Sequence, residues 1–202
     1  MPDSKTFKAG DVVTTRRLRT TSSNPTRTAA SLVREGVLTK VQGGLYYAPR
    51  RTRWGEAPPT AEALLTAWLD GQQNQDWLLT GSAVWNTLGL GSTAVQVRPW
   101  VYNRKRSGAF NLAGHALLLR RVPFPPRPPV EWFVVDLLNH YREAAADLTE
   151  LQQRLAQALA DHRFDPQRLR EQANDYGRKW TQQVVDQAIA ASRDAGCHHS
   201  SR

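Results

Sequence analysis

The residues with the clearest chemical potential are basic and small polar side chains near the start of the chain. Arg27, Ser31 and Arg34 are spaced so that, at about 100° per residue, they fall on one side of a helix. Guanidinium groups bind phosphates and guanine edges, and a small side chain such as that of Ala30 allows a close approach to a groove. The spacing therefore predicts a surface that binds a polyanion.

Catalytic patterns are weaker. The histidines, at positions 115, 140, 162, 198 and 199, show no spacing typical of a zinc site, and Ser82 lacks the glycine two residues later that a nucleophile elbow requires. There is no glycine-rich phosphate loop. Residues 83–130 contain neither Asp nor Glu, so the "GS" at residues 81–82 lacks the carboxylate pair that a two-metal nucleotidyltransferase needs. We expect no catalytic residue, no metal and no cofactor.

The charge is concentrated at the front of the chain. Of the net +9, residues 1–55 contribute eleven Lys/Arg against three Asp/Glu, residues 56–130 seven against four, and residues 131–202 nine against eleven. This division predicts a basic module for a polyanion, joined to a nearly neutral body with another task. No apolar run is long enough to span a bilayer, the stretch "MPDSKTFKAGD" lacks the apolar core that a secretory signal needs, and the only cysteine is Cys197. We therefore expect a cytoplasmic protein without a membrane partner.

The basic side chains require a helix and a hairpin to position them. Ser23 or Asn24 is a suitable N-cap, Pro25 fits the first helical position, and Gly36 fits the C-terminal end, so residues 23–36 predict a capped helix. The following "VLTKVQGGLYYAP" predicts two strands with a turn at the glycines. Upstream, Thr14 or Thr15 can cap a short helix. This order predicts a winged helix-turn-helix that binds double-stranded DNA through Arg16, Arg17, Arg19, Thr26, Arg27, Ser31, Arg34, Lys40 and Gln42.

The rest of the chain predicts an α+β protein. The stretch "RRTRWGEAPP" marks a linker, followed by a helix capped by Thr60, a short helix capped by Ser82, strands over "VQVRPWVYN" and "AFNLAGHALLLRRV", and helices from Trp132 onward. We expect an N-terminal winged helix-turn-helix (1–55), a mixed domain with a small antiparallel sheet and a helical C-terminal part (56–196), and a disordered tail (197–202).

Two blocks together resemble the AbiEi-type antitoxins of type IV toxin–antitoxin systems. "AASLVREGVLTKVQGGLYYAPR" is similar to the end of the family's N-terminal domain, and "TGSAVWNTLGLGSTAVQVRPWVYNRKRSG" to the block that follows. Together they cover roughly residues 11 to 122. Family members usually have a complete helix before this region, whereas ten residues precede Asp11 here, so we expect a short first helix or one supplied by another segment or subunit.

The resemblance implies an antitoxin that represses its own operon and counters a nucleotidyltransferase-type toxin, without the need for a stable complex between the two. Its DNA-binding residues would be Arg27, Ser31, Arg34, Lys40 and Gln42. Two alternatives remain: a transcriptional regulator without a toxin, and a metal-dependent nucleic-acid-processing enzyme that uses Glu131 or Asp136.

Overall fold

The chain forms two compact units in the computed structural model, which describes residues 7–199, the last five as backbone only. Unit 1 contains residues 1–78 and 103–121, and unit 2 contains residues 79–102 and 122–202. Strands β6 (Trp77–Thr80) and β7 (Trp100–Asn103) carry the chain across this division. The units therefore do not follow the boundary at residue 55 that the sequence suggested, because unit 1 includes chain from both sides of that point.

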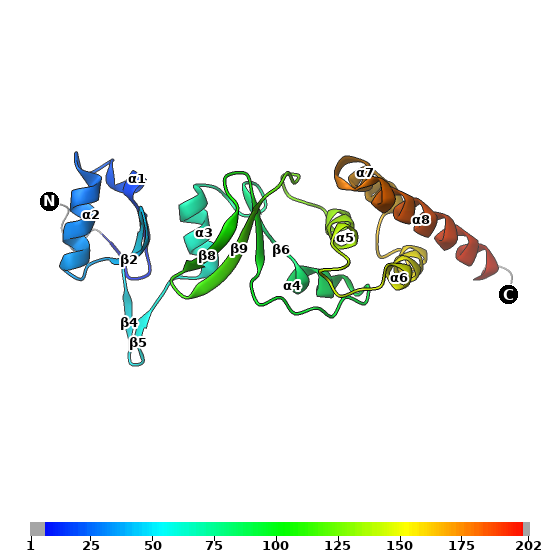
Figure 1. Ribbon diagram of the computed structural model, residues 1–202, viewed down its shortest axis with the longest axis horizontal. Helices are drawn as coiled ribbons and strands as arrows, with labels where there is room; N and C mark the ends of the chain where they lie inside the picture. Colours follow the sequence, from blue (N-terminus) through cyan, green and yellow to red (C-terminus); the bar gives the residue numbers. More distant parts are fainter. Residues whose placement is uncertain (1–6, 200–202) are drawn as a thin grey trace. The chain divides into compact units, whose positions relative to one another are not determined.

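Unit 1 begins with a three-stranded antiparallel sheet and two helices (Figure 1). The elements are β1 (Val12–Thr14), α1 (Thr15–Leu18), α2 (Pro25–Arg34), β2 (Thr39–Gln42) and β3 (Leu45–Tyr47). The sheet order is β1-β3-β2, so the central strand β3 is the last of the three in the sequence. Its three residues are all buried.

Local signals explain where α1 and α2 begin and end. The Thr14 side chain accepts a hydrogen bond from the Arg17 backbone N–H at the start of α1. At the start of α2, the Asn24 side chain accepts from Arg27 N at 3.1 Å, and Pro25 occupies the first turn. Gly36 follows α2 with φ +71°, a conformation that favours glycine. The predicted capped helix is thus confirmed, with Asn24 as its cap.

A small apolar core holds these elements together. Ala29 and Leu32 project from α2 into a cluster of buried residues that also contains Val13, Leu18 and Leu38. Phe7 packs against the same cluster and no helix precedes β1 within residues 7–11, while residues 1–6 lie outside the described part. Because α2 buries one side here, its other side is left for solvent.

The expected linker after this sheet is instead a β-hairpin, so that interpretation was wrong. Strand β4 (Arg50–Thr52) pairs antiparallel with β5 (Gly55–Ala57), and Arg53 and Trp54 form the turn. Gly55 has φ +111°, which makes the tight reversal possible. The sequence did not indicate β4 and β5, because each strand has only three residues and the segment also contains a run of charges and two prolines.

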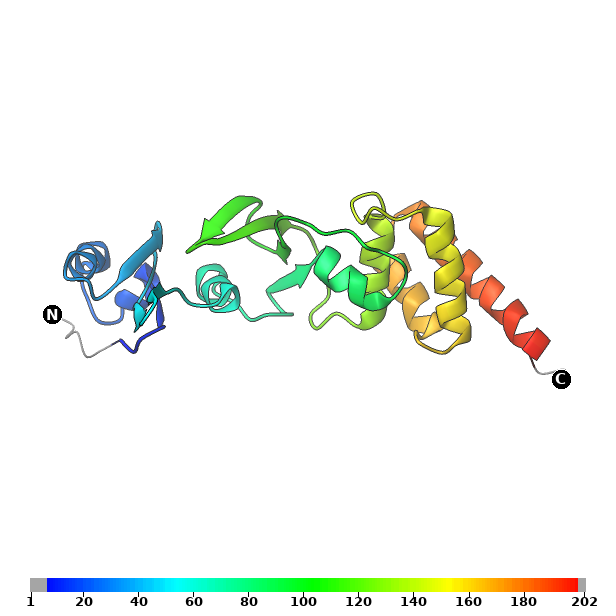
Figure 2. The same ribbon diagram turned by 90° about the horizontal axis from the view of Figure 1, so that it is seen from below.

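The remainder of unit 1 contains α3 (Ala61–Leu69) and the antiparallel pair β8 (Gly108–Leu112) and β9 (His115–Arg121). Thr60 caps α3 as predicted, since its side chain accepts from Ala63 N at 3.2 Å. Helix α3 packs against β1, and Figures 1 and 2 both place it on the opposite side of the three-stranded sheet from α2.

Unit 2 is mainly helical. It contains α4 (Ser82–Trp85), a 3-10 turn (Asn86–Leu88), α5 (Val130–Asn139), α6 (Leu148–Ala160), α7 (Pro166–Tyr176) and α8 (Lys179–His199). Asp147 and Asp165 cap α6 and α7 through their side chains. Helix α8 continues to His199, whereas a disordered tail was expected from residue 197; residues 200–202 of that tail lie outside the described part.

Two local predictions in unit 2 were wrong. Gly81, not Ser82, is the N-cap residue of α4, and the Ser82 hydroxyl accepts instead from Gln96 N at 3.0 Å. The strand expected over residues 95–103 begins only at Trp100, and Val95 and Val97 before it are exposed. The coarse expectation holds: the fold is mixed α+β, with small antiparallel sheets and several helices. Within residues 7–199, no helix combines the length and the apolar character needed to cross a membrane.

Candidate nucleic-acid interface

The exposed side of α2 carries the arginines that the sequence singled out. Thr26, Arg27, Ala30 and Arg34 are exposed, whereas Ala29 and Leu32 of the same helix are buried. Within the described part of the chain, neither guanidinium has an ion-pair partner. The core thus fixes the helix from one side, and two unneutralised cations separated by about two turns project from the other.

Ser31 is tied to its own helix. Its hydroxyl donates a hydrogen bond of 2.7 Å to Glu35 Oε1, one turn further along α2. The side chain is half-buried. A contact from Ser31 to a base edge would therefore require the serine to leave Glu35 or to share its hydroxyl with a second acceptor.

The three arginines near α1 have different surroundings. Arg16 forms an exposed ion pair with Asp70 at the end of α3, and Arg17 Nη1 donates to the Val12 carbonyl oxygen at 3.3 Å. Arg19 is exposed at the C-terminal end of α1. Since exposed ion pairs contribute only about 0–1 kcal/mol, Arg16 could exchange Asp70 for a phosphate at small cost.

The β2–β3 hairpin presents one of its two predicted contacts to solvent. Lys40 is exposed, and Gly43 and Gly44 form the turn, with Gly44 at φ +77°. The pairing of the two strands shifts between Lys40 and Gln42. Gln42 is half-buried, and its Nε2 atom is buried without a hydrogen-bond partner. Of this pair, Lys40 is the better placed to reach a phosphate.

The sequence interpretation missed the basic residues of the β4–β5 hairpin. Arg50, Arg51 and Arg53 are exposed, and the Trp54 side chain at the turn is 84% exposed. The guanidinium carbon of Arg53 lies 4.7 Å from the centre of the Trp54 ring. The sequence signal that could have indicated this hairpin is Gly55, which directly follows Arg53 and Trp54 at the turn.

One carboxylate joins this hairpin to the three-stranded sheet. Glu56 Oε1 accepts hydrogen bonds from the Tyr47 hydroxyl at 2.6 Å and from the Thr39 hydroxyl at 2.9 Å. Burial, reinforced by the hydrogen bond to Glu56 and the charge of this carboxylate, raises the pKa of Tyr47 to about 12. The hairpin's single negative charge is therefore turned toward β2 and β3.

In unit 2, the carboxylates considered for metal chemistry are engaged within the protein. The Asp136 carboxylate accepts hydrogen bonds from Thr80 Oγ1 at 2.6 Å, Trp85 Nε1 at 2.9 Å and the Tyr102 hydroxyl at 2.9 Å. Glu131 Oε1 accepts from Asp165 N at 3.1 Å. Both acids are 4% exposed. Among the described residues, no group of three or more His, Cys, Asp or Glu side chains could hold a metal ion.

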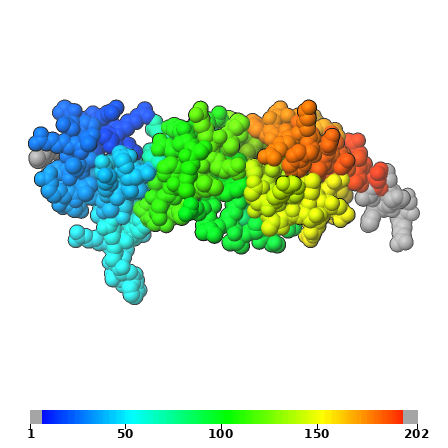
Figure 3. All heavy atoms as spheres, viewed as in Figure 1, coloured from blue at the N-terminus to red at the C-terminus, as the bar shows by residue number. Residues whose placement is uncertain are grey.

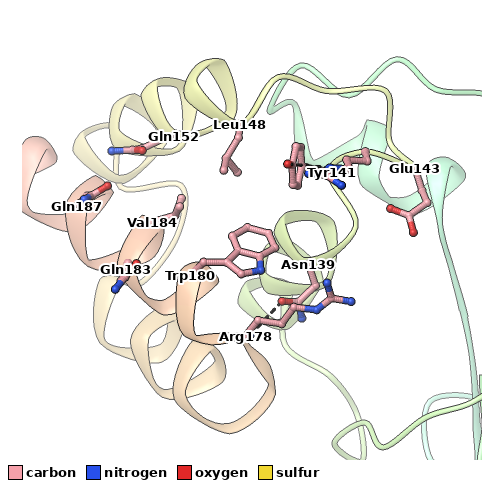
Figure 4. A pocket seen from close by; sticks show the side chains of 11 residues that line it. Asn139, Tyr141, Glu143, Leu148, Gln152, Arg178, Trp180, Gln183, Val184 and Gln187 are labelled. Atoms are coloured by element: carbon pink, nitrogen blue, oxygen red, sulfur yellow. Dashed lines mark hydrogen bonds between the residues drawn. The ribbon is translucent and has the colours of Figure 1, made fainter.

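Unit 2 also contains an open cavity of about 620 Å³ next to α5, α6 and α8 (Figure 4). The Tyr141 and Trp180 rings meet edge to face with centres 5.6 Å apart. Asn139 Oδ1 accepts from the Arg178 backbone N–H at 3.2 Å. The lining mixes aromatic, amide and basic groups: Asn139, Tyr141, Arg142, Glu143, Leu148, Gln152, Arg178, Trp180, Gln183, Val184 and Gln187.

Comparison with known proteins gives a likeness to a solved structure. The chain is similar to the RV2827C protein from Mycobacterium tuberculosis, with 16% identity and a TM-score of 0.48, over 96% of this chain and 78% of that one. No protein-family model matches the chain, and no curated protein matches it. The functional assignment therefore depends on the residues and their geometry.

Proposed function

We propose that this protein is a DNA-binding transcriptional repressor, and that residues 12–47 form a winged helix-turn-helix with α2 as its recognition helix. The chain order β1, α1, α2, β2, β3 supports this assignment, because two helices joined by a short turn are followed by a two-stranded wing. The sheet order β1-β3-β2 supports it as well, since the wing strands then extend a sheet that starts before the helices.

One observation carries the proposal: α2 buries its apolar side in the core and exposes Arg27 and Arg34, which have no ion-pair partner among the described residues. Small or polar residues, Thr26 and Ala30, lie beside these arginines and leave room for a groove wall. Arginine makes bidentate contacts to guanine in the major groove, and such contacts contribute about 1–3 kcal/mol of discrimination.

Binding to duplex DNA from the region upstream of the chain's own coding sequence tests the proposal. Fluorescence anisotropy should show that Arg27→Ala and Arg34→Ala each weaken binding by about 1–3 kcal/mol. Arg168→Ala on α7 is a matched control, because Arg168 is also an exposed helical arginine and its pair with Asp165 is an exposed one at 3.8 Å. Wild-type affinity in both α2 variants would show that this side of the helix does not read the operator.

We further propose, from the family resemblance, that the protein acts as an antitoxin against a nucleotidyltransferase-type toxin. This role would belong to the chain beyond the winged helix. Co-expression with the neighbouring gene tests it: a toxic nucleotidyltransferase whose growth arrest is relieved by this chain is the expected result. A neighbour that is not toxic, with DNA binding intact, would indicate the stand-alone regulator.

A third experiment addresses the rival enzyme. If the protein is a repressor and not a nuclease, Asp136→Asn should leave duplex affinity unchanged. The Asp136 carboxylate accepts its hydrogen bonds from residues of unit 2, whereas the proposed DNA-binding residues belong to unit 1. Metal-dependent cleavage of DNA or RNA that disappears in Asp136→Asn or Glu131→Gln would instead establish the enzyme.

A further inference from the structure

The β4–β5 hairpin (residues 50–57) is exposed on both of its faces. All three residues of β4 are exposed, as are Gly55 and Glu56 of β5, and Figure 3 shows this segment projecting from the body of unit 1. An isolated two-stranded hairpin is only marginally stable in water. A segment of this kind either needs an internal anchor or becomes ordered against a partner.

The anchor is Glu56, and its use leaves the rest of the hairpin strongly basic. Because Glu56 accepts hydrogen bonds from Thr39 and Tyr47, its carboxylate is directed toward β2 and β3. Arg50, Arg51 and Arg53 have no ion-pair partner in the described part of the chain. Since successive side chains of a strand alternate, Arg50 and Arg51 project from opposite faces. Each face of the hairpin therefore carries an arginine, and Arg51 shares its face with its register partner Glu56.

Trp54 gives the tip of this basic hairpin a flat apolar surface. Its side chain is 84% exposed and stacks with the guanidinium of Arg53. An exposed aromatic ring flanked by arginines can pack against sugars or bases while the cations contact phosphates. The major groove of duplex DNA admits a two-stranded ribbon, and proteins that bind the minor groove frequently insert apolar side chains between base steps.

We propose that the β4–β5 hairpin is a further DNA-contacting element beside α2 and the β2–β3 wing, with Arg50, Arg51 and Arg53 on the phosphate backbone and Trp54 against a groove of the same duplex. The inference rests on the proposed function, since α2 and this hairpin belong to one unit. It assigns DNA contact to a segment whose sequence was typical of a linker.

Salt-dependent binding separates this inference from the recognition-helix assignment. In the Arg50→Ala/Arg51→Ala/Arg53→Ala variant, the slope of log affinity against log salt should become shallower by roughly 0.9 for each phosphate that the variant no longer neutralises, or about 2–3 in total. Affinity should decrease by a similar factor for the upstream duplex and for a scrambled duplex. The charge-matched control is Arg168→Ala/Arg170→Ala/Arg193→Ala, whose exposed arginines lie on α7 and α8. It should keep the wild-type slope.

Quenching by acrylamide examines Trp54 itself. The contribution of Trp54 is the part of the wild-type fluorescence that Trp54→Phe lacks. Acrylamide should quench this contribution readily in the unbound protein and much less after the upstream duplex is added. Circular dichroism of each variant checks that the fold is intact, and because the substituted side chains are exposed, the spectra should match that of wild type.

The outcomes distinguish the two proposals. If the hairpin variant and Trp54→Ala bind like wild type while Arg27→Ala weakens binding, the hairpin inference fails and the proposed function stands. If the wild-type protein binds neither duplex, both fail. If Trp54→Ala abolishes self-association in analytical ultracentrifugation without changing DNA affinity, the hairpin is a protein–protein contact and the inference is overturned.

Discussion

The Tyr47–Glu56 hydrogen bond predicts a specific response to alkaline pH. The pKa of Tyr47 is raised from the ordinary value of 10.0 to about 12, first by burial and then by the hydrogen bond and charge of Glu56. The folded state thus favours the neutral phenol. Its contribution is fully present below pH 10 and is lost as the pH rises from 10 through about 12. Two pKa units would correspond to about 2–3 kcal/mol of unfolding free energy without screening, and because Glu56 is exposed to solvent, screening reduces the expected contribution to about 1 kcal/mol.

The assay is a spectrophotometric titration of tyrosinate in wild type and Tyr47→Phe. The difference between the two curves should titrate with a midpoint near pH 12. In Glu56→Gln the midpoint should fall but remain above the ordinary value of 10.0, because the charge is removed while the burial stays. Urea unfolding should show a steeper decrease in stability over this alkaline range for wild type than for Tyr47→Phe. A Tyr47 midpoint at the ordinary value would refute the buried, hydrogen-bonded geometry that anchors the hairpin.

Three further predictions concern the helix cap, the buried acid and the wing. Asn24→Ala should lower the free energy of unfolding by about 1 kcal/mol in chemical denaturation, because it removes the acceptor for Arg27 N. Asp136→Asn should destabilise unit 2 by about 1–3 kcal/mol in the same assay, since it converts an acceptor of three hydrogen bonds into a group with only one acceptor oxygen. Lys40→Ala should make the salt dependence of duplex binding shallower by about 0.9, measured by anisotropy at several salt concentrations.

Helix boundaries were predictable because the relevant signals are local. Asn24, Pro25 and Gly36 act within one turn of α2, so the sequence contains the information that ends the helix. The same holds for Thr60 at α3. Capping chemistry does not depend on tertiary partners, and this explains why these predictions were confirmed.

Features that depend on distant partners were not predictable. The sequence predicted Ser82 as a helix cap, but its hydroxyl instead accepts a hydrogen bond from the backbone N–H of Gln96, fourteen residues later. Glu56 carries no local sign that Thr39 and Tyr47 will bind it, so the hairpin that it anchors resembled a linker. Gln42 is a residue type that suits a contact at the tip of a wing. Its amide nitrogen is nevertheless buried, at the position where the strand pairing shifts.

For the candidate interface, the sequence predicted the exposed arginines of α2 but not their surroundings. Helical spacing alone places Arg27 and Arg34 opposite Leu32, and the structure has the leucine buried and the arginines exposed. The pairing of Arg16 with Asp70 joins residues from two helices far apart in the chain. No periodicity in the sequence encodes that contact.

The central claim is that α2 lies in a groove of the operator, and DNA cleavage from a tethered reagent tests it most directly. In a Cys197→Ser background, Thr26→Cys would carry an iron chelate on the exposed side of α2. Thr66→Cys on α3 is the matched control, because Thr66 is exposed and α3 lies across the three-stranded sheet from α2 (Figure 2). We predict discrete cuts in the upstream duplex from the Thr26→Cys conjugate and far weaker cutting from the control. Equal cutting from both positions, or none from Thr26→Cys while the duplex is bound, would contradict the assignment of α2 as the recognition helix.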